Sequence, residues 1–484
     1  VFGGFAASEL AVRLTDAAPK VIVTATCGIE VARVIEYMPL VNEAIEMASH
    51  QPESVVVLER PQADYQLIAG RDYSYVDLMG SVNSIGCVPV SATHPLYILY
   101  TSGTTGKPKG VVRDNGGHAV AMAYSMQAVY DMKPGEVFWA ASDVGWVVGH
   151  SYIVYAPLLF GCTTLLYEGK PVRTPDAGAF WRVIEEYKVK VIFSAPTAFR
   201  AIRKEDPDNE HYKKYDTSSL EALYLAGERL DPPTYYWLNE LTQLPVIDHW
   251  WQTETGWAIA SDPRGIESFP PKAGSATRPS PGFCVEIFDP NGNPVAVGEQ
   301  GSVVIKRPLP PSCLTTIWGN HARCEESYLN TYEGYYLTGD GGFIDTDGYI
   351  FIMGRMDDVI NVAGHRLSTG EMEEVLAGHH SVAECAVIGV SDELKGQLPV
   401  GLVVLKDGIT SSRESVESEL IGAIRNRVGA LACFNKALIV KRLPKTRSGK
   451  ILRGTLRKIA DGEPYSMPST IEDPAVLSEI EQHF

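Results

Sequence analysis

The sequence is short of positive charge. Its 42 Lys and Arg residues face 59 Asp and Glu residues, which gives a formal net charge of −17. A nucleic-acid backbone requires a basic surface on its partner, so this balance argues against nucleic-acid binding. The chain also has no internal repeat and no long low-complexity tract. With 45% hydrophobic and 21% charged residues it has the composition of a globular protein, and 484 residues suffice for more than one domain.

Cysteine is scattered rather than paired. None of the 8 cysteines forms a C-x-x-C pair, which argues against a zinc site and favours reduced thiols in an intracellular compartment, the cytoplasm or the mitochondrial matrix. A basic targeting segment and a signal peptide are also missing at the beginning of the sequence. Residues 1–5 are instead typical of a turn inside a domain.

Long uninterrupted apolar runs are absent too. Residues 144–167 contain no Asp, Glu, Lys or Arg and could in length cross a bilayer. Gly149 and Pro157 interrupt this stretch, so we interpret it as a loop, a helix over 151–159 and a strand over 163–167 in a buried α/β core. We therefore expect no membrane partner.

The most informative stretch is an apolar run over residues 96–100 that predicts a buried strand and ends in hydroxyls, glycines and lysines. The residues that follow are Thr101, Ser102, Gly103, Thr104, Thr105, Gly106, Lys107 and Lys109. Glycine N–H groups, hydroxyls and ammonium groups together suit a phosphate chain, although a plain hairpin loop is the alternative. Pro108 stands where the common nucleotide-binding loop needs a hydroxyl residue, which weakens kinase and GTPase interpretations.

Helices and strands alternate along the first half of the chain, which predicts an α/β fold with parallel sheets. The predicted helices are 8–19, 39–50 and 180–187, and the predicted strands are 20–24, 54–58, 189–193 and 223–225. Ligands of such sheets bind beyond the carboxyl ends of the strands. The turns after Tyr100, Phe193, Leu225 and Ile247 are therefore where we expect the site.

The turn after Ile247 carries Asp248, His249, Trp250, Trp251, Gln252, Thr253 and Glu254. Glu254 is a hard oxygen ligand that suits Mg²⁺ on a phosphate chain. The alternative is a core tryptophan pair beside a surface glutamate. We interpret His249 as structural.

Further polar motifs follow. They are Gly227-Glu228-Arg229, Thr338-Gly339-Asp340, Gly354-Arg355 with Asp357, Gly364-His365-Arg366, and Lys445-Thr446-Arg447-Ser448-Gly449-Lys450. Alternating strands over 282–306 with a hairpin signal at 289–292 predict a small β subdomain. Helices over 370–378 and 413–428 with strands over 383–390 and 400–406 predict a compact α+β unit at the end.

In this order the motifs resemble those of the adenylate-forming superfamily, which comprises acyl-CoA synthetases, luciferases and peptide-synthetase adenylation domains. The resemblance covers residues 1–460. It implies an AMP-binding domain over 1–356, incomplete at its N-terminus, and a mobile α+β lid over 357–484 with its hinge at Asp357. The chemistry it implies is the ATP-dependent activation of a carboxylate through an acyl-adenylate, followed by attack of the coenzyme A thiol.

The resemblance also implies residue roles. The stretch from Thr101 to Lys109 would bind the β- and γ-phosphates, Glu254 would hold Mg²⁺, the turn at Gly227 would contact adenine through its main chain, and Asp340 with Arg355 would hold the ribose. Arg366 would contact phosphate, and Lys450 would be the catalytic lysine, a candidate for control by a lysine acetyltransferase and deacetylase. Gly364 would line the thiol tunnel, and Arg425 would lie near the CoA 3′-phosphate.

Within the superfamily the resemblance is to short-chain acyl-CoA synthetases. The implied acyl pocket consists of Val147, Val148, Ala226 and Trp251, and the Trp251 indole would exclude long acids. Acetyl-CoA synthetases typically carry valine at the position of Ala226 and threonine at the position of Val148. The smaller alanine and the apolar valine of this sequence therefore favour propionate. The alternatives are an acetyl-CoA synthetase, a peptide-synthetase adenylation domain and, in a different class, an inactive nucleotide-binding protein.

Overall fold

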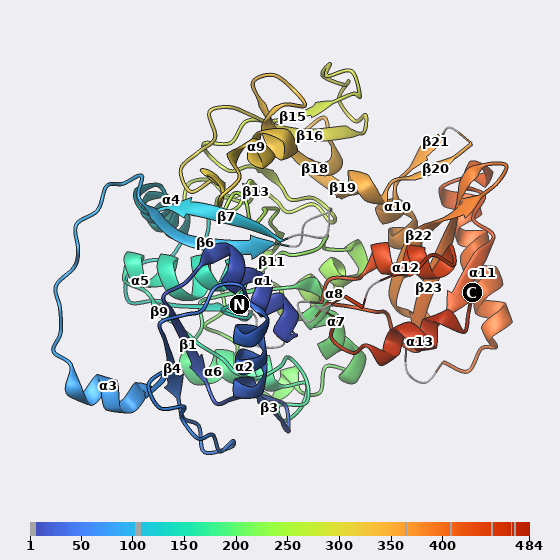
Figure 1. Cartoon of the computed structure of the whole chain (residues 1–484). Helices are drawn as coiled ribbons and strands as arrows, with labels where there is room; N and C mark the ends of the chain where they lie inside the picture. Colours follow the sequence, from blue (N-terminus) through green and yellow to red (C-terminus); the bar gives the residue numbers. More distant parts are fainter. Residues whose placement is uncertain are drawn as a thin grey trace.

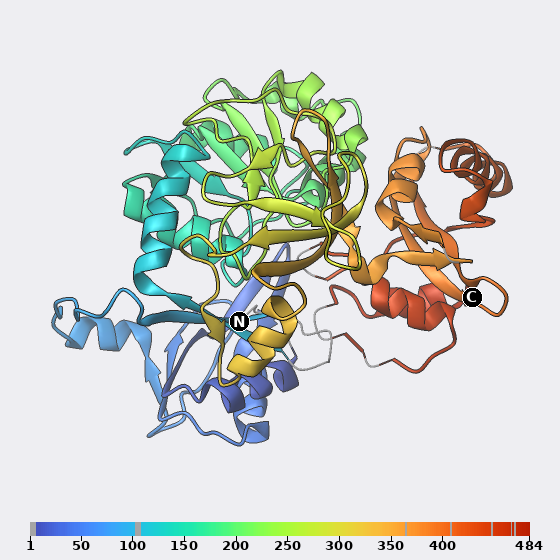
Figure 2. The same cartoon turned by 90° about the horizontal axis from the view of Figure 1, so that it is seen from above.

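A computed structural model describes residues 6–101, 108–363, 365–406, 409–446, 449–465, 467–468 and 471–484, with the side chains of Asp357, His365 and Arg366 outside the description. The elements form a large lobe that ends with strand β19 (Ile350–Arg355) and a small lobe that starts with β20 (Ile360–Val362). Figures 1 and 2 show the small lobe, in orange and red, beside the large one. The predicted α/β class is confirmed.

The centre of the large lobe is a parallel sheet in the strand order β12-β11-β10-β8-β9. Its strands are β8 (Val137–Ala140), β9 (Thr163–Thr164), β10 (Val191–Ser194), β11 (Ala222–Leu225) and β12 (Val246–Asp248). All residues of β10 and β11 are buried, because α6 (Ala179–Tyr187), α7 (Pro196–Glu205) and α8 (Pro232–Thr242) share a hydrophobic cluster with the sheet. The alternate residues of the two strands, such as Phe193 and Tyr224, lie in a second cluster on the other face. Burial on both faces explains the continuous apolar runs of these strands. The predicted strands 189–193 and 223–225 and helix 180–187 are confirmed.

A second parallel sheet lies near the beginning of the chain. Its strands are β1 (Val21–Ala25), β4 (Ser54–Leu58) and β5 (Asp72–Ser74), and it packs against α1 (Ala7–Ala17) and α2 (Tyr37–Met47). The hairpin β2 (Cys27–Glu30) with β3 (Arg33–Glu36) and helix α3 (Tyr75–Ser81) complete this region. The helices predicted over 8–19 and 39–50 and the strands predicted over 20–24 and 54–58 are confirmed within a few residues.

Two predictions about the apolar stretches need correction. The strand over 96–100 is β6 (Pro95–Thr101), but only Leu99 is buried, because β6 is an edge strand paired antiparallel with the buried β7 (Lys109–Asp114), which in turn pairs with β17 (Thr316–Ile317). The strand expected over 163–167 is reduced to Thr163–Thr164, because these are the only residues of the stretch that pair with β8, and Tyr167 packs edge-on against Trp139.

The stretch expected as a helix over 151–159 is helical in two segments. A π-helical segment covers Gly149–Tyr155, and α5 (Ala156–Phe160) continues it. Helix α4 (Asn115–Ala128) packs beside α5. No helix in the described part of the chain is long and apolar enough to cross a membrane.

The predicted β subdomain is an antiparallel sheet in the order β15-β16-β18-β19. Strands β15 (Val285–Phe288) and β16 (Gly301–Lys306) flank the predicted turn, where the Asp289 N–H donates to Asn293 O and Gly292 has a φ of 84°. Strand β18 (Tyr335–Ile344) carries the Thr338-Gly339-Asp340 motif toward β12. The short pair β13 (Ala260–Ser261) and β14 (Arg278–Pro279), helix α9 (His321–Cys324) and the π-helical Glu325–Leu329 lie in the same part of the chain.

The small lobe is built on β21 (His365–Leu367), β20, β23 (Gly396–Leu405) and β22 (Val382–Asp392), with β24 (Lys436–Ile439) parallel to β23. Helices α10 (Thr369–Ala377) and α11 (Arg413–Arg427) share one hydrophobic cluster with the sheet, and α12 (Arg453–Ala460) and α13 (Ala475–Glu481) share another. Neighbouring β22 residues divide between the clusters, Val387 in the first and Ala386 with Ile388 in the second, as a two-faced sheet requires. The four elements predicted here are confirmed.

Candidate functional site

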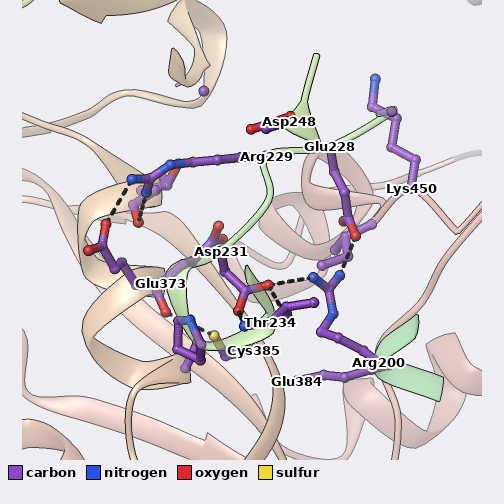
Figure 3. Close-up of a pocket in the computed structure, with 18 of the residues that line it drawn as sticks. Arg200, Glu228, Arg229, Asp231, Thr234, Asp248, Glu373, Glu384, Cys385 and Lys450 are labelled. Atoms are coloured by element: carbon purple, nitrogen blue, oxygen red, sulfur yellow. Dashed lines mark hydrogen bonds and ion pairs between the residues drawn. The ribbon is translucent and has the colours of Figure 1, made fainter. Parts of the chain in front are cut away.

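A pocket of about 750 Å³ lies between the two lobes, at the carboxyl ends of β11 and β12 (Figure 3). It collects many of the predicted residues, which come from segments far apart in the sequence. They are Gly227, Glu228, Arg229, Asp248, His249, Trp250, Trp251, Gln252, Asp340, Arg355 and Lys450. The expectation that the site gathers beyond Leu225 and Ile247 agrees with this pocket.

Asp340 is an acid of the pocket that several donors hold in place. Its Oδ2 accepts hydrogen bonds from Trp250 Nε1 (3.0 Å) and Gln252 Nε2 (2.7 Å), and its Oδ1 lies 3.4 Å from Arg355 Nη1. Burial raises the pKa of the carboxyl, while Arg355 and the two donors lower it. The carboxylate is fixed in one orientation and can accept hydrogen bonds from a sugar diol.

The turn after β11 presents its main chain to the pocket because its side chains are engaged elsewhere. Gly227 has a φ of 99°, and a Cβ there would meet nothing within 4 Å. Glu228 pairs with Arg200, whose Nη1 also lies 2.8 Å from Asp231 Oδ2. Arg229 pairs with Glu374 of α10 at 2.8 Å. This arrangement is compatible with main-chain recognition of a base.

Burial shifts the pKa values of Asp248 and His249, at the end of β12, in opposite directions. Asp248 accepts a hydrogen bond from the Leu230 N–H (3.2 Å), and burial raises its pKa to about 7. His249 is almost fully buried between Leu225 O (2.9 Å) and Tyr130 OH (3.1 Å), and burial lowers its pKa to about 4. The ring is therefore neutral and structural in this arrangement, in agreement with its interpretation from the sequence.

Lys450 lies on a tight hairpin of the small lobe. Its carbonyl accepts from the Thr446 N–H (2.7 Å) and its own N–H donates to Thr446 Oγ1 (3.1 Å). Gly449 has a φ of 87° and packs against Thr197 of α7, where an added Cβ would lie 2.7 Å from Oγ1. The Lys450 side chain lines the pocket. Desolvation there is the main cause that lowers the pKa of its ammonium group, and the positive charge of Arg355 lowers it further. A primary ammonium group thus faces the same pocket as Asp340.

A second polar group lies at the beginning of β7. Tyr328 OH donates to Glu254 Oε1 (2.5 Å) and accepts from Lys109 Nζ (2.6 Å), and Lys109 Nζ lies 3.8 Å from the same carboxylate oxygen. Burial lowers the pKa of Lys109. The Thr101 hydroxyl is buried without a hydrogen-bond partner among the described residues. The predicted loop residues Ser102, Gly103, Thr104, Thr105, Gly106 and Lys107 lie outside the described residues.

Glu254 fits a Mg²⁺ ion that is shared with phosphate. Its side chain is 13% exposed, and no cluster of three His, Cys, Asp or Glu side chains that could enclose a metal occurs in the described part of the chain. Mg²⁺ usually takes one or two protein carboxylates and completes its shell with water and substrate phosphates. A single carboxylate beside an ammonium group suits that mode.

The predicted acyl-pocket residues belong mostly to one hydrophobic cluster. Ala226 is 4% exposed, and Val148 and Trp251 pack against the cluster that contains it. The centroid of the Trp251 ring lies 5.6 Å from that of Tyr152 and 6.0 Å from that of Phe193, two neighbours that the sequence analysis did not name. Val147 is half-buried and, like Val148, helical, directly before the π-helical segment.

Of the remaining predicted residues, one lies outside the pocket and three fall wholly or partly outside the description. Arg425 is exposed on α11 and is not a lining residue of the pocket. The backbone of Asp357 lies in the 3₁₀ turn Met356–Asp358, between β19 and β20. Arg366 lies on β21 with its side chain outside the description, and Gly364 is outside it altogether.

Arg113 is a supporting residue that the sequence analysis missed. It is fully buried, and its guanidinium donates to the carbonyl oxygens of Thr253, Glu254 (2.9 Å) and Ser312, and to Tyr97 OH (3.2 Å). Arg113 therefore fixes the backbone that carries Glu254. Ser312 is 199 positions away in the sequence, so no local pattern predicts this contact.

The sequence matches the family described as AMP-binding enzyme over residues 1–313 and the family described as AMP-binding enzyme C-terminal domain over residues 371–450. The chain belongs to the AMP-binding enzyme family, which confirms the predicted resemblance.

Its relatives carry related names. The chain is 60% identical to an uncharacterized protein of Pseudomonas aeruginosa, over 99% of this chain and 77% of that protein. It is 49% identical to acyl-CoA synthetase short-chain family member 3, mitochondrial, of Mus musculus, over 100% of this chain and 71% of the relative. It is 46% identical to a propionate–CoA ligase of Escherichia coli, over 100% of this chain and 78% of that ligase.

Two solved structures share the fold. An acetoacetyl-CoA synthetase from Streptomyces lividans superposes with a TM-score of 0.85 at 23% identity, over 99% of this chain and 72% of the other. The anthranilate CoA ligase AuaEII in complex with anthranoyl-AMP superposes with a TM-score of 0.81 at 24% identity, over 95% of this chain and 82% of the other. At these identities the likeness establishes the fold of a large N-terminal and a small C-terminal part.

Proposed function

We propose that the protein is an ATP-dependent, AMP-forming short-chain acyl-CoA synthetase whose preferred acid is propionate. Propionate would attack the α-phosphate of ATP to give propionyl-adenylate and diphosphate. The thiol of coenzyme A would then attack the acyl carbon, releasing AMP and forming propionyl-CoA. The observation that carries this proposal is the Lys450 side chain, which lines the same pocket as the firmly held Asp340.

The first step brings a carboxylate and a polyphosphate together, so positive charge is its main catalytic requirement. Lys450 supplies an ammonium group at the mouth of the pocket, and Lys109 supplies another beside Glu254. Glu254 would hold Mg²⁺, which when bound neutralises phosphate charge. Asp340 would accept the ribose hydroxyls, and the backbone at Gly227 would contact the base.

The second step needs the thiol to approach where Lys450 stands. We propose that the small lobe turns about Asp357 after adenylate formation, which withdraws Lys450 and opens a passage beside Gly364. The support for this is the position of Asp357 in a short turn between β19 and β20, where the chain passes from one lobe to the other. By the same reasoning, acetylation of Lys450 would remove its charge and inhibit the first step.

The preference for propionate rests on Ala226 and Val148. Both contribute to the cluster that Trp251 closes, together with the rings of Tyr152 and Phe193. Alanine in place of valine leaves roughly the volume of two methyl groups, and valine in place of threonine gives an apolar surface. An extra buried methylene is worth on the order of 1–3 kcal/mol, which corresponds to a preference of about ten- to two-hundred-fold over acetate.

The experiment compares diphosphate release with acetate, propionate and butyrate, with and without coenzyme A, and identifies the acyl product by mass spectrometry. A propionyl-CoA product and the highest kcat/KM for propionate support the proposal. The highest kcat/KM for acetate would make the protein an acetyl-CoA synthetase instead. ATP binding without release of diphosphate for any acid would indicate a nucleotide-binding protein without this activity.

A further inference from the structure

Two neighbouring glutamates of α10 connect the nucleotide pocket to the hairpin of Lys450. Glu374 contacts the large lobe through Arg229, and Glu373 contacts the small lobe through Arg453. Figure 3 shows Arg229, Glu373 and Lys450 around the same pocket. Because α10 is one short rigid helix, the two ion pairs are mechanically linked.

The pair across the lobes is specific in geometry. Arg229 Nη2 lies 2.8 Å from Glu374 Oε2, and Nη1 donates to the carbonyl oxygen of Gly370 at 3.4 Å. The guanidinium packs tightly against Gly274, where an added Cβ would lie 2.8 Å from Nη2. The Arg229 and Glu374 side chains are 17% and 33% exposed. Partial burial and a second acceptor distinguish this pair from a solvated surface pair, which contributes little.

The pair within the small lobe leads on to Lys450. Arg453 donates to both oxygens of Glu373 at 2.9 Å, and Glu373 Oε1 also accepts the Val387 N–H at 2.8 Å. Arg453 opens α12 directly after the hairpin that carries Lys450. The position of α10 against the turn after β11 therefore determines where the Lys450 hairpin lies.

We propose that Arg229 and Glu374 are positioning residues for adenylate formation: their ion pair holds α10 against the large lobe and thereby keeps Lys450 in the pocket. The proposal rests on the proposed function. The pair must break when the small lobe turns away, so it favours the first half-reaction and contributes nothing to the second. Losing it shifts the population of lobe arrangements without removing a group that touches the substrates.

The experiment measures the two half-reactions separately in Glu374→Gln. Acid-dependent exchange of diphosphate into ATP reports the first, and CoA-dependent consumption of supplied propionyl-adenylate reports the second. We expect kcat for exchange to fall about tenfold with an unchanged KM for ATP, while the second half-reaction stays within about twofold. The exchanged pair Arg229→Glu/Glu374→Arg should recover part of the loss, as a direct interaction requires.

The matched control is Glu479→Gln, which breaks an ion pair with Arg442 inside the small lobe and whose carboxylate is about as exposed as that of Glu374, 38% against 33%. It should leave both half-reactions unchanged. Equal losses in both half-reactions of Glu374→Gln, or no loss in exchange, would overturn the proposal.

Hydrogen exchange measures the contact between the lobes without depending on enzyme activity. Glu374→Gln should increase deuterium uptake in the α7 peptide that contacts Gly449 and in the turn after β11. Unchanged uptake would contradict the positioning role. A wild-type protein without acid-dependent exchange would overturn the proposed function instead, and the uptake experiment would still test whether the pair docks the lobes.

Discussion

Lys450 is the residue whose charge matters most to the proposed first step. We expect Lys450→Ala to lower adenylate formation on the order of a hundredfold or more, because only this step brings two anions together. Attack of coenzyme A on supplied propionyl-adenylate should remain within a few-fold. Diphosphate exchange and adenylate consumption measure the two steps. Lys458→Ala, at an exposed position on α12, is the control, and equal loss in both steps of Lys450→Ala would contradict its assignment.

Ala226 carries the prediction on the acid. Ala226→Val adds volume to a position that is 4% exposed and lies in the cluster against which Trp251 packs. We expect the ratio of kcat/KM for propionate to that for acetate to fall about tenfold, because a longer acid loses more space than a shorter one. Steady-state kinetics with both acids measure the ratio. An unchanged ratio would show that Ala226 does not determine chain length.

Asp248 carries a prediction on pH. Burial raises its folded pKa from 3.8 to about 7, so the folded protein binds this proton more tightly than the unfolded chain. The stability from this group is fully present below about pH 4 and is lost as pH rises toward 7. The unfolding temperature of the wild type should therefore fall relative to that of Asp248→Asn between pH 5 and 8. A constant difference over this range would contradict the shift.

At this scale the sequence predicted the residues that gather in the pocket but not those that support them. Asp340, Trp250 and Lys450 belong to motifs whose order along the chain resembles that of a known superfamily. Arg113 and Tyr328 were missed, because their role arises from contacts with backbone or side chains far away in the sequence. A buried arginine or tyrosine leaves no periodic signal that distinguishes it from an ordinary strand or helix residue.

At the scale of elements, strand and helix assignments were accurate wherever burial produced a continuous or periodic pattern. Strands β10 and β11 are buried on both faces, and their sequences are therefore nearly continuous runs of apolar residues. Strand β6 is similarly apolar but lies at the edge of an antiparallel sheet, so the sequence overestimates its burial. Hydrophobicity alone does not reveal which strand is an edge strand, since that depends on the partner strands β7 and β17.

The turn between β19 and β20 carries a prediction about motion. Proline at Asp357 would lie within the first turn of the 3₁₀ segment, where a missing N–H is tolerated, but it would fix φ at the proposed hinge. We expect Asp357→Pro to slow thioester formation at least tenfold and to affect adenylate formation much less. Single-turnover measurements of each half-reaction test this. An unaltered second half-reaction would show that the hinge lies elsewhere.

At the scale of the whole molecule, an acidic chain gathers positively charged side chains locally at the candidate site. The net charge is −17, yet Lys109, Arg355 and Lys450 lie beside Asp340 or Glu254 at the two parts of the candidate site. The cations are contributed by both lobes, so the site is complete only when the lobes are together. Arrangement of the lobes is therefore part of the proposed chemistry and could not be predicted from any single motif.

The most direct test of the account is the exchange of labelled diphosphate into ATP in the presence of Mg²⁺ and one acid at a time, without coenzyme A. We predict exchange that requires the acid and Mg²⁺, is most efficient with propionate, is weaker with acetate and is absent with long fatty acids, which the Trp251 indole would exclude. The absence of acid-dependent exchange, or efficient exchange with a long fatty acid, would contradict the proposed activity.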